Sequence, residues 1–309
     1  MIIHPGFVGI DVSKHHLDLF DAARGASRIA NTAEAVVGLA AMLAADGGFV
    51  TFEATGVYDR ALASALANAG VPFARVNPAR ARDFARAAGF LAKTDAVDAK
   101  MLAAMGQCLR PRQSAPAEPG RERLTSLAKR RDQLVAMRQQ ERTRRRECCD
   151  ADITDDLDRH LAFLDAAIAG LEQRIATAIA ADRQLQQDQR LMRSVPGIGP
   201  VTAVTLIALM PELGSRSPKQ IAALAGLAPL NADSGAFRGK RAIRGGRKRV
   251  RDALYMAAVS AMRSSTHLAE FYQRLRRAGK APKAALIALA RKLLVTLNAM
   301  LRDKTAFQP

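Results

Sequence analysis

An acidic residue inside an apolar segment near the start of the chain constrains the fold more than any other feature. Residues 7–12 form a short apolar run of strand character, Asp11 lies within it, and the polar residues 13–16 end it. An aspartate in the middle of a buried strand is costly unless it is paired or binds a metal. Asp11 therefore predicts a polar site built on a β-sheet.

Strands and helices alternate through the first third of the chain in a recognisable order. In chain order they are expected to be strands at 7–12, 17–20 and 27–30, a helix at 33–45, a strand at 49–53, a helix at 57–69 capped by Thr55, a strand at 71–76 and a helix from Thr94. This is the element order of the ribonuclease H-like fold, a mixed α/β sheet whose first and fourth strands are neighbours.

Four acidic residues stand where this fold would bring them together. Asp11 and Glu53 lie on the first and fourth strands, and Asp95 and Asp98 share one face of the last helix. Converging carboxylates with no arginine nearby would repel one another unless divalent cations lay between them. Because oxygen ligands favour Mg²⁺, or Mn²⁺ in its place, over zinc, the sequence predicts a magnesium site and an enzyme that cuts phosphodiesters.

Each acid taken alone has a simpler structural interpretation. Asp95 and Asp98 are first-turn acids of the kind that the helix dipole favours, and Glu53 could end its strand at the surface. Asp11 is harder to explain in this way, because the apolar residues around it leave little route to solvent. The ordered set of four favours the metal site.

Composition bounds the remaining possibilities. The 309 residues are 49% hydrophobic, which is enough for two domains with cores of their own. Neither a signal peptide nor a membrane span is predicted, since Arg291 and Lys292 interrupt the apolar C-terminal helix. Cys108, Cys148 and Cys149 predict neither a disulfide framework nor a zinc site. We therefore expect a cytoplasmic protein.

The net charge of +18 is concentrated near the C-terminus. Residues 1–110, 111–190 and 191–309 carry net charges of +1, +1 and +16, and residues 238–251 contain eight basic residues and no acidic one. Such a segment predicts a polyanionic partner whose binding weakens steeply with salt. The alternative is a solvated basic loop that only aids solubility.

A proline-rich boundary and a helical middle divide the chain into three predicted domains. Residues 110–120 contain three prolines, and apolar residues recur at steps of three and four from Ile153 to Ile179. With the basic helix expected at 121–146, this pattern predicts a long helical hairpin or coiled coil, within one chain or between two. The predicted domains are 1–110, a metal-binding α/β domain; 111–190, a coiled-coil connector; and 191–309, an all-helical C-terminal domain.

Two further motifs lie in the C-terminal part. The glycines of Pro196-Gly197-Ile198-Gly199 predict a helix-hairpin-helix element, in which backbone N–H groups approach a phosphate, although packing or assembly could also explain them. Ser234 precedes the basic segment, and its spacing alone indicates only a turn or capping serine.

Six short motifs follow one another in a specific order along the chain. They are residues 9–14, 53–56, 93–99, 195–199, 226–229 and 234–235. In this order they resemble the DEDD transposases of bacterial insertion sequences, the IS one-ten family, over nearly the whole chain. The resemblance implies a RuvC-like domain whose acids match Asp11, Glu53, Asp95 and Asp98, a coiled-coil connector, and a C-terminal transposase domain whose nucleophilic serine matches Ser234.

The resemblance also implies a mechanism and partners. A structured non-coding guide RNA from the element, a bridge RNA, would pair with donor and target DNA. Ser234 would attack a DNA phosphate to form a 5′-phosphoserine link that conserves bond energy, and carboxylate-bound Mg²⁺ would polarise that phosphate. The protein would be a homo-oligomer, a dimer or a tetramer in the synaptic complex, associated with the bacterial nucleoid and not with a membrane.

Basic residues and hairpin glycines are the expected contacts with nucleic acid. Those nearest Ser234 in sequence are close enough to hold the attacked phosphate. The expected set is Arg238, Lys240, Arg241, Arg244, Arg247, Lys248, Arg249, Gly197 and Gly199.

Two other classes of protein stay open. One is a metal-dependent nuclease or junction resolvase in which water attacks and Ser234 is incidental. The other is a non-catalytic nucleic-acid-binding protein, which the intact set of four acids disfavours. A tyrosine recombinase is disfavoured, since Tyr58, Tyr255 and Tyr272 lack an evident Arg-His constellation.

Overall fold

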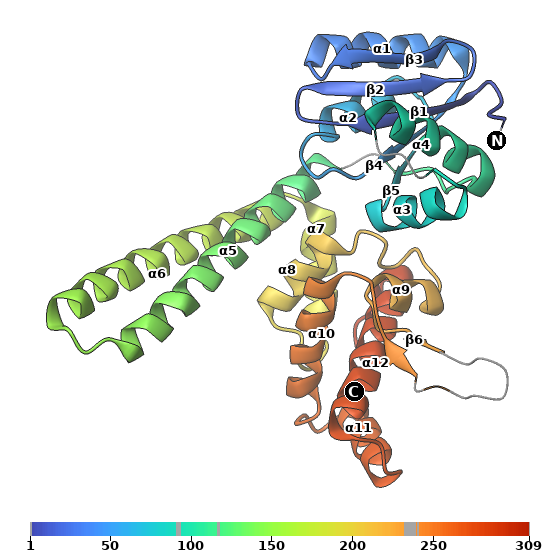
Figure 1. Ribbon diagram of the computed structural model, residues 1–309. Helices are drawn as coiled ribbons and strands as arrows, with labels where there is room; N and C mark the ends of the chain where they lie inside the picture. Colours follow the sequence, from blue (N-terminus) through green and yellow to red (C-terminus); the bar gives the residue numbers. More distant parts are fainter. Residues whose placement is uncertain (1, 91–93, 116–117, 232–238, 240, 309) are drawn as a thin grey trace. The chain divides into compact units, whose positions relative to one another are not determined.

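The chain divides into two compact units, residues 1–117 and 118–309. The structure, a computed structural model, describes residues 2–90, 94–115, 118–231, 239 and 241–308 (Figure 1). Within the second unit one hydrophobic core runs from Leu124 to Leu301, so the long helices and the C-terminal helices share buried side chains. The three-part division at residues 110 and 190 stays a prediction.

The first unit is a five-stranded mixed sheet with helices on both faces. Its elements are β1 (Phe7–Val12), β2 (His16–Asp21), β3 (Gly25–Ala30), α1 (Ala33–Asp46), β4 (Phe49–Glu53), α2 (Arg60–Asn68), β5 (Phe73–Val76), α3 (Pro78–Ala87) and α4 (Asp95–Leu109). The strand order is β3-β2-β1-β4-β5, and β1 lies antiparallel to β2 and parallel to β4. The prediction that the first and fourth strands are neighbours is confirmed.

Two local expectations for this unit are wrong. Helix α2 begins at Arg60, and its N-cap residue is Asp59, not Thr55. Helix α3 was not expected, although its start signal is present: the Asn77 side chain accepts a hydrogen bond from the N–H of Ala79 at 2.8 Å, and proline follows at the first helical position.

The alternation of side chains along the strands separates two faces of the sheet. One face packs on α1 and α2 through a core that includes Val8, Ile10, Val50 and Phe52. The opposite face is covered by α4, which packs against β1, β2 and β4. Asp11 belongs to this second face, because it alternates with Ile10 and Val12 along β1.

Two glycines set the distance between α4 and the sheet. A Cβ atom on Gly9 of β1 would lie 1.9 Å from the Ala99 carbonyl oxygen and 2.4 Å from the Ala103 nitrogen. A Cβ atom on Gly106 of α4 would lie 2.4 Å from Oγ1 of Thr51. Since neither position has room for a side chain, the helix backbone lies directly on the strands.

Apart from one two-stranded ribbon, the described elements of the second unit are helices. In chain order they are α5 (Pro119–Glu147), α6 (Ala151–Ala180), α7 (Arg183–Arg193), α8 (Pro200–Leu209), α9 (Pro218–Leu224), β6 (Pro229–Leu230), β7 (Ala242–Ile243), α10 (Lys248–Ala261), α11 (His267–Arg277) and α12 (Pro282–Asp303).

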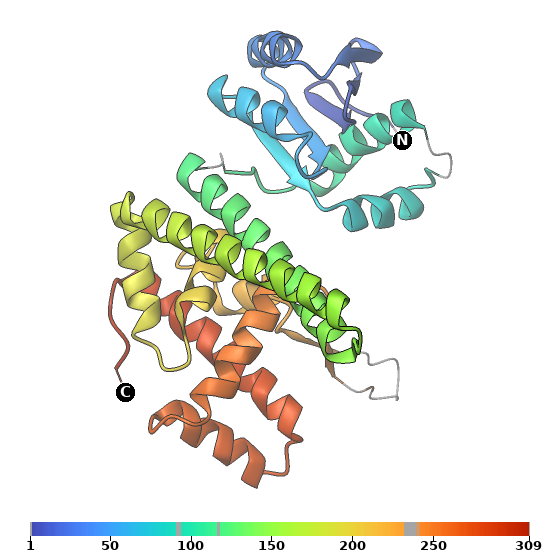
Figure 2. The ribbon, with the colours of Figure 1, turned by 90° about the vertical axis from the view of Figure 1, so that its left-hand side faces the viewer.

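Helices α5 and α6 form the expected hairpin within one chain (Figures 1 and 2). The apolar stripe of α6 is buried from Leu164 to Ile179. Ion pairs spaced by heptads connect the two helices: Arg131 to Glu172 at 2.8 Å, Arg138 to Asp165 at 2.5 Å and Arg145 to Asp158 at 2.8 Å. The intramolecular hairpin is thus confirmed, while pairing between two chains stays a prediction.

Helix α12 supplies much of the core of the second unit. Leu289, Leu293 and Leu297 are fully buried in it. By length and composition α12 is apolar enough to cross a membrane, the one such helix among the described residues, yet 56% of its apolar window is buried inside the protein. Burial of this extent is expected of a core helix.

Candidate active site

The strand registers place three carboxylates and one arginine in a row across the sheet. Asp11 of β1 pairs with Asp18 of β2, and Asp18 pairs with Arg28 of β3. Strands β1 and β4 run parallel in a register whose continuation brings Asp11 beside Glu53. Because directly paired residues point to the same face of a sheet, the row lies under α4.

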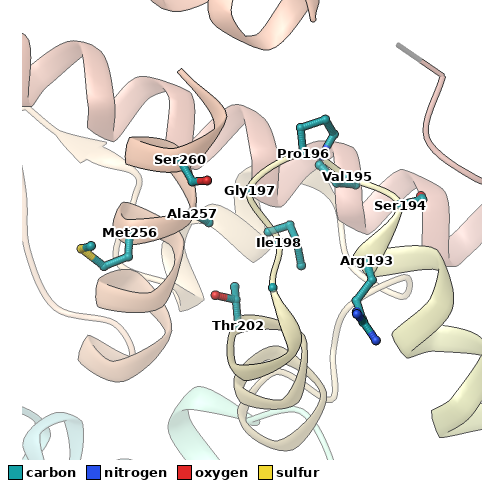
Figure 3. Close-up of a pocket in the computed structure, with 11 residues that line it drawn as sticks. Arg193, Ser194, Val195, Pro196, Gly197, Ile198, Thr202, Met256, Ala257 and Ser260 are labelled. Atoms are coloured by element: carbon teal, nitrogen blue, oxygen red, sulfur yellow. The ribbon is translucent and has the colours of Figure 1, made fainter. Parts of the chain in front are cut away.

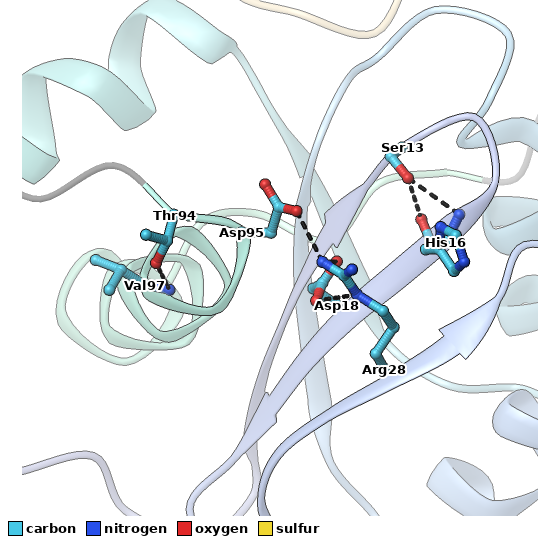
Figure 4. Close-up of polar contacts among 7 residues, drawn as sticks. All are labelled: Ser13, His16, Asp18, Arg28, Thr94, Asp95 and Val97. Atoms are coloured by element: carbon cyan, nitrogen blue, oxygen red, sulfur yellow. Dashed lines mark hydrogen bonds and ion pairs between the residues drawn. The ribbon is translucent and has the colours of Figure 1, made fainter.

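The first turn of α4 brings two more acids to this row. The Thr94 side chain caps the helix by accepting a hydrogen bond from the N–H of Val97 at 3.3 Å, so the helix begins at Asp95 (Figure 4). Asp95 and Asp98 both lie in this turn, where the helix dipole stabilises negative charge. The expected helix start near Thr94 is confirmed.

The electrostatics of Asp11 show that the acids are close together. Burial first, and then the negative charges of Asp98, Asp95 and Asp18, together raise the pKa of Asp11 from 3.8 to about 6. The structure thus brings Asp11, Asp95 and Asp98 within electrostatic range of one another, and the register places Glu53 on the neighbouring strand.

An arginine lies among these acids, so the expectation that none is nearby is wrong. Arg28 donates from Nε to Oδ1 of Asp18 at 2.9 Å and from Nη2 to Oδ2 of Asp18 at 3.0 Å. The same Nη2 donates to Oδ2 of Asp95 at 2.8 Å (Figure 4). Asp18 is only 7% exposed, so this arginine neutralises a nearly buried charge.

Sequence reasoning missed both Asp18 and Arg28. A signal existed for Asp18, which alternates with the buried Leu17 and Leu19 as Asp11 alternates with its own apolar neighbours. Arg28 gave no such signal, because β3 is exposed along most of its length.

The chemistry of the acids suits a hard divalent cation. All the donors are carboxylate oxygens, and the raised pKa of Asp11 reflects its burial first and then the nearby negative charges, both of which a bound cation would offset. Within the described parts of the chain, however, no three His, Cys, Asp or Glu side chains are gathered where they could hold an ion. The residues therefore fit Mg²⁺ by donor type and by the elements that carry them, although their side chains are not gathered around one point and Asp95 is directed to Arg28.

Side chains on neighbouring elements hold the loops that follow β1 and β4. Asn31 donates from Nδ2 to the carbonyl oxygen of Ser13 at 2.9 Å and to that of Tyr58 at 3.1 Å. The fully buried Asp59 accepts a hydrogen bond from Nε of Arg75 at 2.7 Å. The last two contacts hold residues 58 and 59, at the end of the segment that connects Glu53 to α2.

In the second unit, residues 194–199 connect α7 to α8 and line a pocket of about 530 Å³ (Figure 3). Arg193, Thr202 and Ser260 contribute polar side chains to it. The hairpin packs closely on α10, since a Cβ atom on Gly197 would lie 2.4 Å from the Ala257 carbonyl oxygen. Gly197 also has a positive φ of 90°. Gly199 has open space beside it. A contact of either glycine with phosphate stays a prediction.

Some of the predicted basic contacts are exposed and some form ion pairs, and Lys248 does both, with a side chain that is 80% exposed. Arg241 and Arg244 are exposed. The others that the structure describes form ion pairs: Arg247 with Glu212 at 2.6 Å, Lys248 with Asp252 at 2.6 Å and Arg249 with Asp132 at 2.8 Å. Arg238 and Lys240 lie outside the described residues. The contact of this set with nucleic acid stays a prediction.

Close backbone packing brings together the two sides of the segment that contains Ser234. Strands β6 and β7 pair on either side of residues 231–241. Gly226 precedes β6 and Gly246 follows β7 in the chain. A Cβ atom on Gly246 would lie 2.2 Å from the Gly226 nitrogen, and both glycines have positive φ. Ser234 itself lies outside the described residues.

A row of acids beneath a helix start, in a chain whose other unit is strongly basic, is typical of a class of protein: enzymes that act on nucleic acid by phosphoryl transfer.

Comparison with known proteins specifies the family. Residues 189–273 match the transposase family described as IS116/IS110/IS902, and residues 8–151 match the DEDD transposases of the IS110 type. The chain is 31% identical over 259 residues to the pilin gene-inverting protein of Moraxella lacunata. The aligned region is 82% of this chain and 80% of that protein. It is 34% identical over 157 residues, 50% of this chain and 38% of the relative, to the 44.8 kDa protein of insertion element IS116 from Streptomyces clavuligerus. The chain belongs to the IS116/IS110/IS902 family of transposases and is an enzyme of DNA recombination.

Proposed function

We propose that this transposase cuts and rejoins DNA strands with Ser234 as the nucleophile and with a divalent ion held by Asp11, Glu53, Asp95 and Asp98. The observation that carries the proposal is the position of Asp11: it lies beside Glu53 on the sheet, beneath the turn with Asp95 and Asp98, with its pKa raised to about 6. We also propose that the first unit has the ribonuclease H-like fold.

The acids of the first unit have one task in this proposal. Mg²⁺, when bound, supplies positive charge that stabilises the oxygens of the attacked phosphate. Asp11 and Glu53 hold it from the rigid sheet, whereas Asp95 and Asp98 approach from α4. Since Asp11 must be deprotonated to bind a cation, activity should fall below about pH 6.

The serine makes the reaction reversible. Oγ of Ser234 forms a bond to phosphorus as the bond from phosphorus to the 3′ oxygen breaks; the serine proton is transferred to a base, and the departing 3′ oxygen takes up a proton from an acid or from water. One end then carries a 5′-phosphoserine link and the other a 3′ hydroxyl, so a new 3′ hydroxyl can reseal the strand without ATP.

A relative's name supports rejoining over simple cutting. The Moraxella lacunata protein is named as gene-inverting. Inversion of a gene leaves both ends of the excised segment joined again, which a hydrolytic nuclease alone does not achieve.

The proposed partners are donor DNA, target DNA and a guide RNA encoded by the element. The net charge of +16 in residues 191–309 and the exposed Arg241 and Arg244 support a polyanionic partner. We propose that Gly199 and the hairpin around it contact a phosphate as a helix-hairpin-helix element. A homo-oligomer, a dimer or tetramer, would hold several DNA strands at once.

The test is a denaturing-gel assay for a covalent protein-DNA adduct. It compares wild type with Ser234→Ala and Asp11→Ala, using Mg²⁺, RNA from the non-coding DNA that flanks the element, and matching DNA. The control is Ser126→Ala, because Ser126 is exposed on α5 and its hydroxyl only bonds the Glu122 carbonyl of its own helix at 3.0 Å. We expect an adduct with wild type and with the control, and none with the other two.

Cleavage that survives Ser234→Ala without an adduct would instead indicate a metal-dependent nuclease. Cleavage that survives Asp11→Ala would reject the role of the carboxylates.

A further inference from the structure

We propose that Arg28 is a positioning residue that holds the Asp95 carboxylate at the Asp18 end of the carboxylate row until a divalent ion takes Asp95 over, with Asp18 as the permanent anchor of Arg28. This inference rests on the proposed metal site and adds two residues to it.

The ion pair with Asp18 is the stronger of the two contacts that Arg28 makes. Asp18 and Arg28 are directly paired across β2 and β3, and both carboxylate oxygens of Asp18 accept hydrogen bonds from the guanidinium. Because the Asp18 side chain is 9% exposed, breaking this pair would leave a nearly buried charge without compensation. Asp18 is thus occupied by Arg28 and is not available as a metal ligand.

The contact with Asp95 is the weaker one. It uses Nη2, which Asp18 already shares, and it lies among side chains that are 52% exposed for Arg28 and 58% exposed for Asp95. Water competes at such a site, and an exposed ion pair changes an equilibrium by a factor of about five at most. Asp95 can therefore leave Arg28 at little cost, while Arg28 stays on Asp18.

A counter-charge is needed at this place. Asp18, Asp95 and Asp98 are close enough to Asp11 for their charges to repel it, and the guanidinium that pairs with Asp18 and Asp95 reduces that repulsion in the absence of a metal ion. A divalent ion does the same more strongly, but closing the cluster requires the carboxylate that Arg28 holds. Arg28 and the ion are consequently competitors for Asp95.

The experiment is a titration of the full-length protein with Mn²⁺, in which free Mn²⁺ is measured by electron paramagnetic resonance. The variants are Arg28→Ala, Arg28→Lys, Asp11→Asn and, as a matched control, Arg24→Ala. Arg24 makes a similar bidentate ion pair with Asp46, from Nη1 to Oδ2 at 2.5 Å and from Nη2 to Oδ1 at 3.0 Å. Asp46 is the last residue of α1 and lies outside the site. A second readout is the thermal unfolding midpoint with and without Mn²⁺.

We expect Arg28→Ala to bind Mn²⁺ about fivefold more tightly than wild type, because the competitor is gone. The Mn²⁺ affinity of Arg28→Lys should lie between those of wild type and Arg28→Ala. Lysine keeps the positive charge but lacks the planar guanidinium that donates to two carboxylates at once. Arg24→Ala should equal wild type, and Asp11→Asn should lose the site. Without metal, Arg28→Ala should unfold at a lower temperature, because Asp18 loses its partner, and Mn²⁺ should raise its midpoint by more than that of wild type.

If Arg28→Ala does not fold, Arg28→Lys alone decides the question. Wild-type or weaker Mn²⁺ affinity in the Arg28 variants, with affinity lost in Asp11→Asn, would overturn this inference and leave the metal site standing. Absence of Mn²⁺ binding by the wild type itself would overturn the proposed metal site and this inference with it.

Discussion

At the scale of single residues, Asp11 is placed where its charge is costly without a cation. Its carboxylate is partly buried on the sheet and faces the negative charges of Asp98, Asp95 and Asp18. Functional sites often contain such groups. The buried charge lowers the stability of the folded protein, and a bound ligand that neutralises the charge removes this destabilisation. If the proposed metal site is right, it has lower stability without metal in return for affinity for the ion.

This trade predicts a pH-dependent effect of Asp11→Asn. In the folded protein the pKa of Asp11 is about 6, above the ordinary value of 3.8, so its ionisation lowers stability progressively as the pH rises between these values. We expect Asp11→Asn to be more stable than wild type by about 1–2 kcal/mol at about pH 7.5, after allowance for partial exposure, and equal to it at about pH 4.

The measurement is chemical unfolding in EDTA at both pH values. Asp83→Asn is the control, because Asp83 is exposed on α3 with a side chain that is 75% exposed. A stability difference between Asp11→Asn and wild type that is the same at both pH values would contradict the prediction.

At the scale of elements, the site depends on how closely α4 lies on the sheet. Gly9 permits this contact, and the helix start at Asp95 then falls above the carboxylate row. The order of the strands along the chain and the start of α4 were predicted from sequence, because apolar periodicity and a threonine cap are local signals. The close packing of α4 on the sheet was not predicted, because a glycine in a strand does not indicate which element approaches it.

We expect Gly9→Ala to destabilise the protein by about 3 kcal/mol or more, because the added methyl group meets backbone atoms that cannot rotate away. It should also weaken Mn²⁺ binding, since α4 carries Asp95 and Asp98. Gly38→Ala in α1 is the matched control: nothing lies within 4 Å of its added Cβ atom, and alanine should stabilise the helix by about 0.5–1 kcal/mol. Equal stability of the two variants in chemical unfolding would show that α4 shifts without cost.

At the scale of the whole molecule, charge and chemistry are divided between the two units. The described acids of the site lie in residues 1–117, and the excess positive charge lies in the second unit, which has its own core. We therefore expect residues 118–309, produced alone, to fold and to bind duplex DNA, losing about 10³-fold in affinity between about 50 and 200 mM salt. Residues 1–117 produced alone are the control and should bind weakly.

Fluorescence anisotropy with a labelled duplex at several salt concentrations measures both affinities. A shallow salt dependence for residues 118–309 would mean that few phosphates are contacted, and that the basic residues serve mainly the internal pairs seen for Arg247 and Arg249.

The sequence by itself determined most elements of the first unit, though not α3, and which of them carry Asp11, Glu53, Asp95 and Asp98, because caps, apolar periodicity and strand character act within short segments. The heptad repeat of the hairpin was readable for the same reason. Only the tertiary structure decided that Asp18 and Arg28 join the site, since this follows from the registers of three strands. It likewise decided that Arg249 pairs with Asp132, 117 residues away. Contacts of this kind depend on how separate elements pack, and no local pattern specifies that packing.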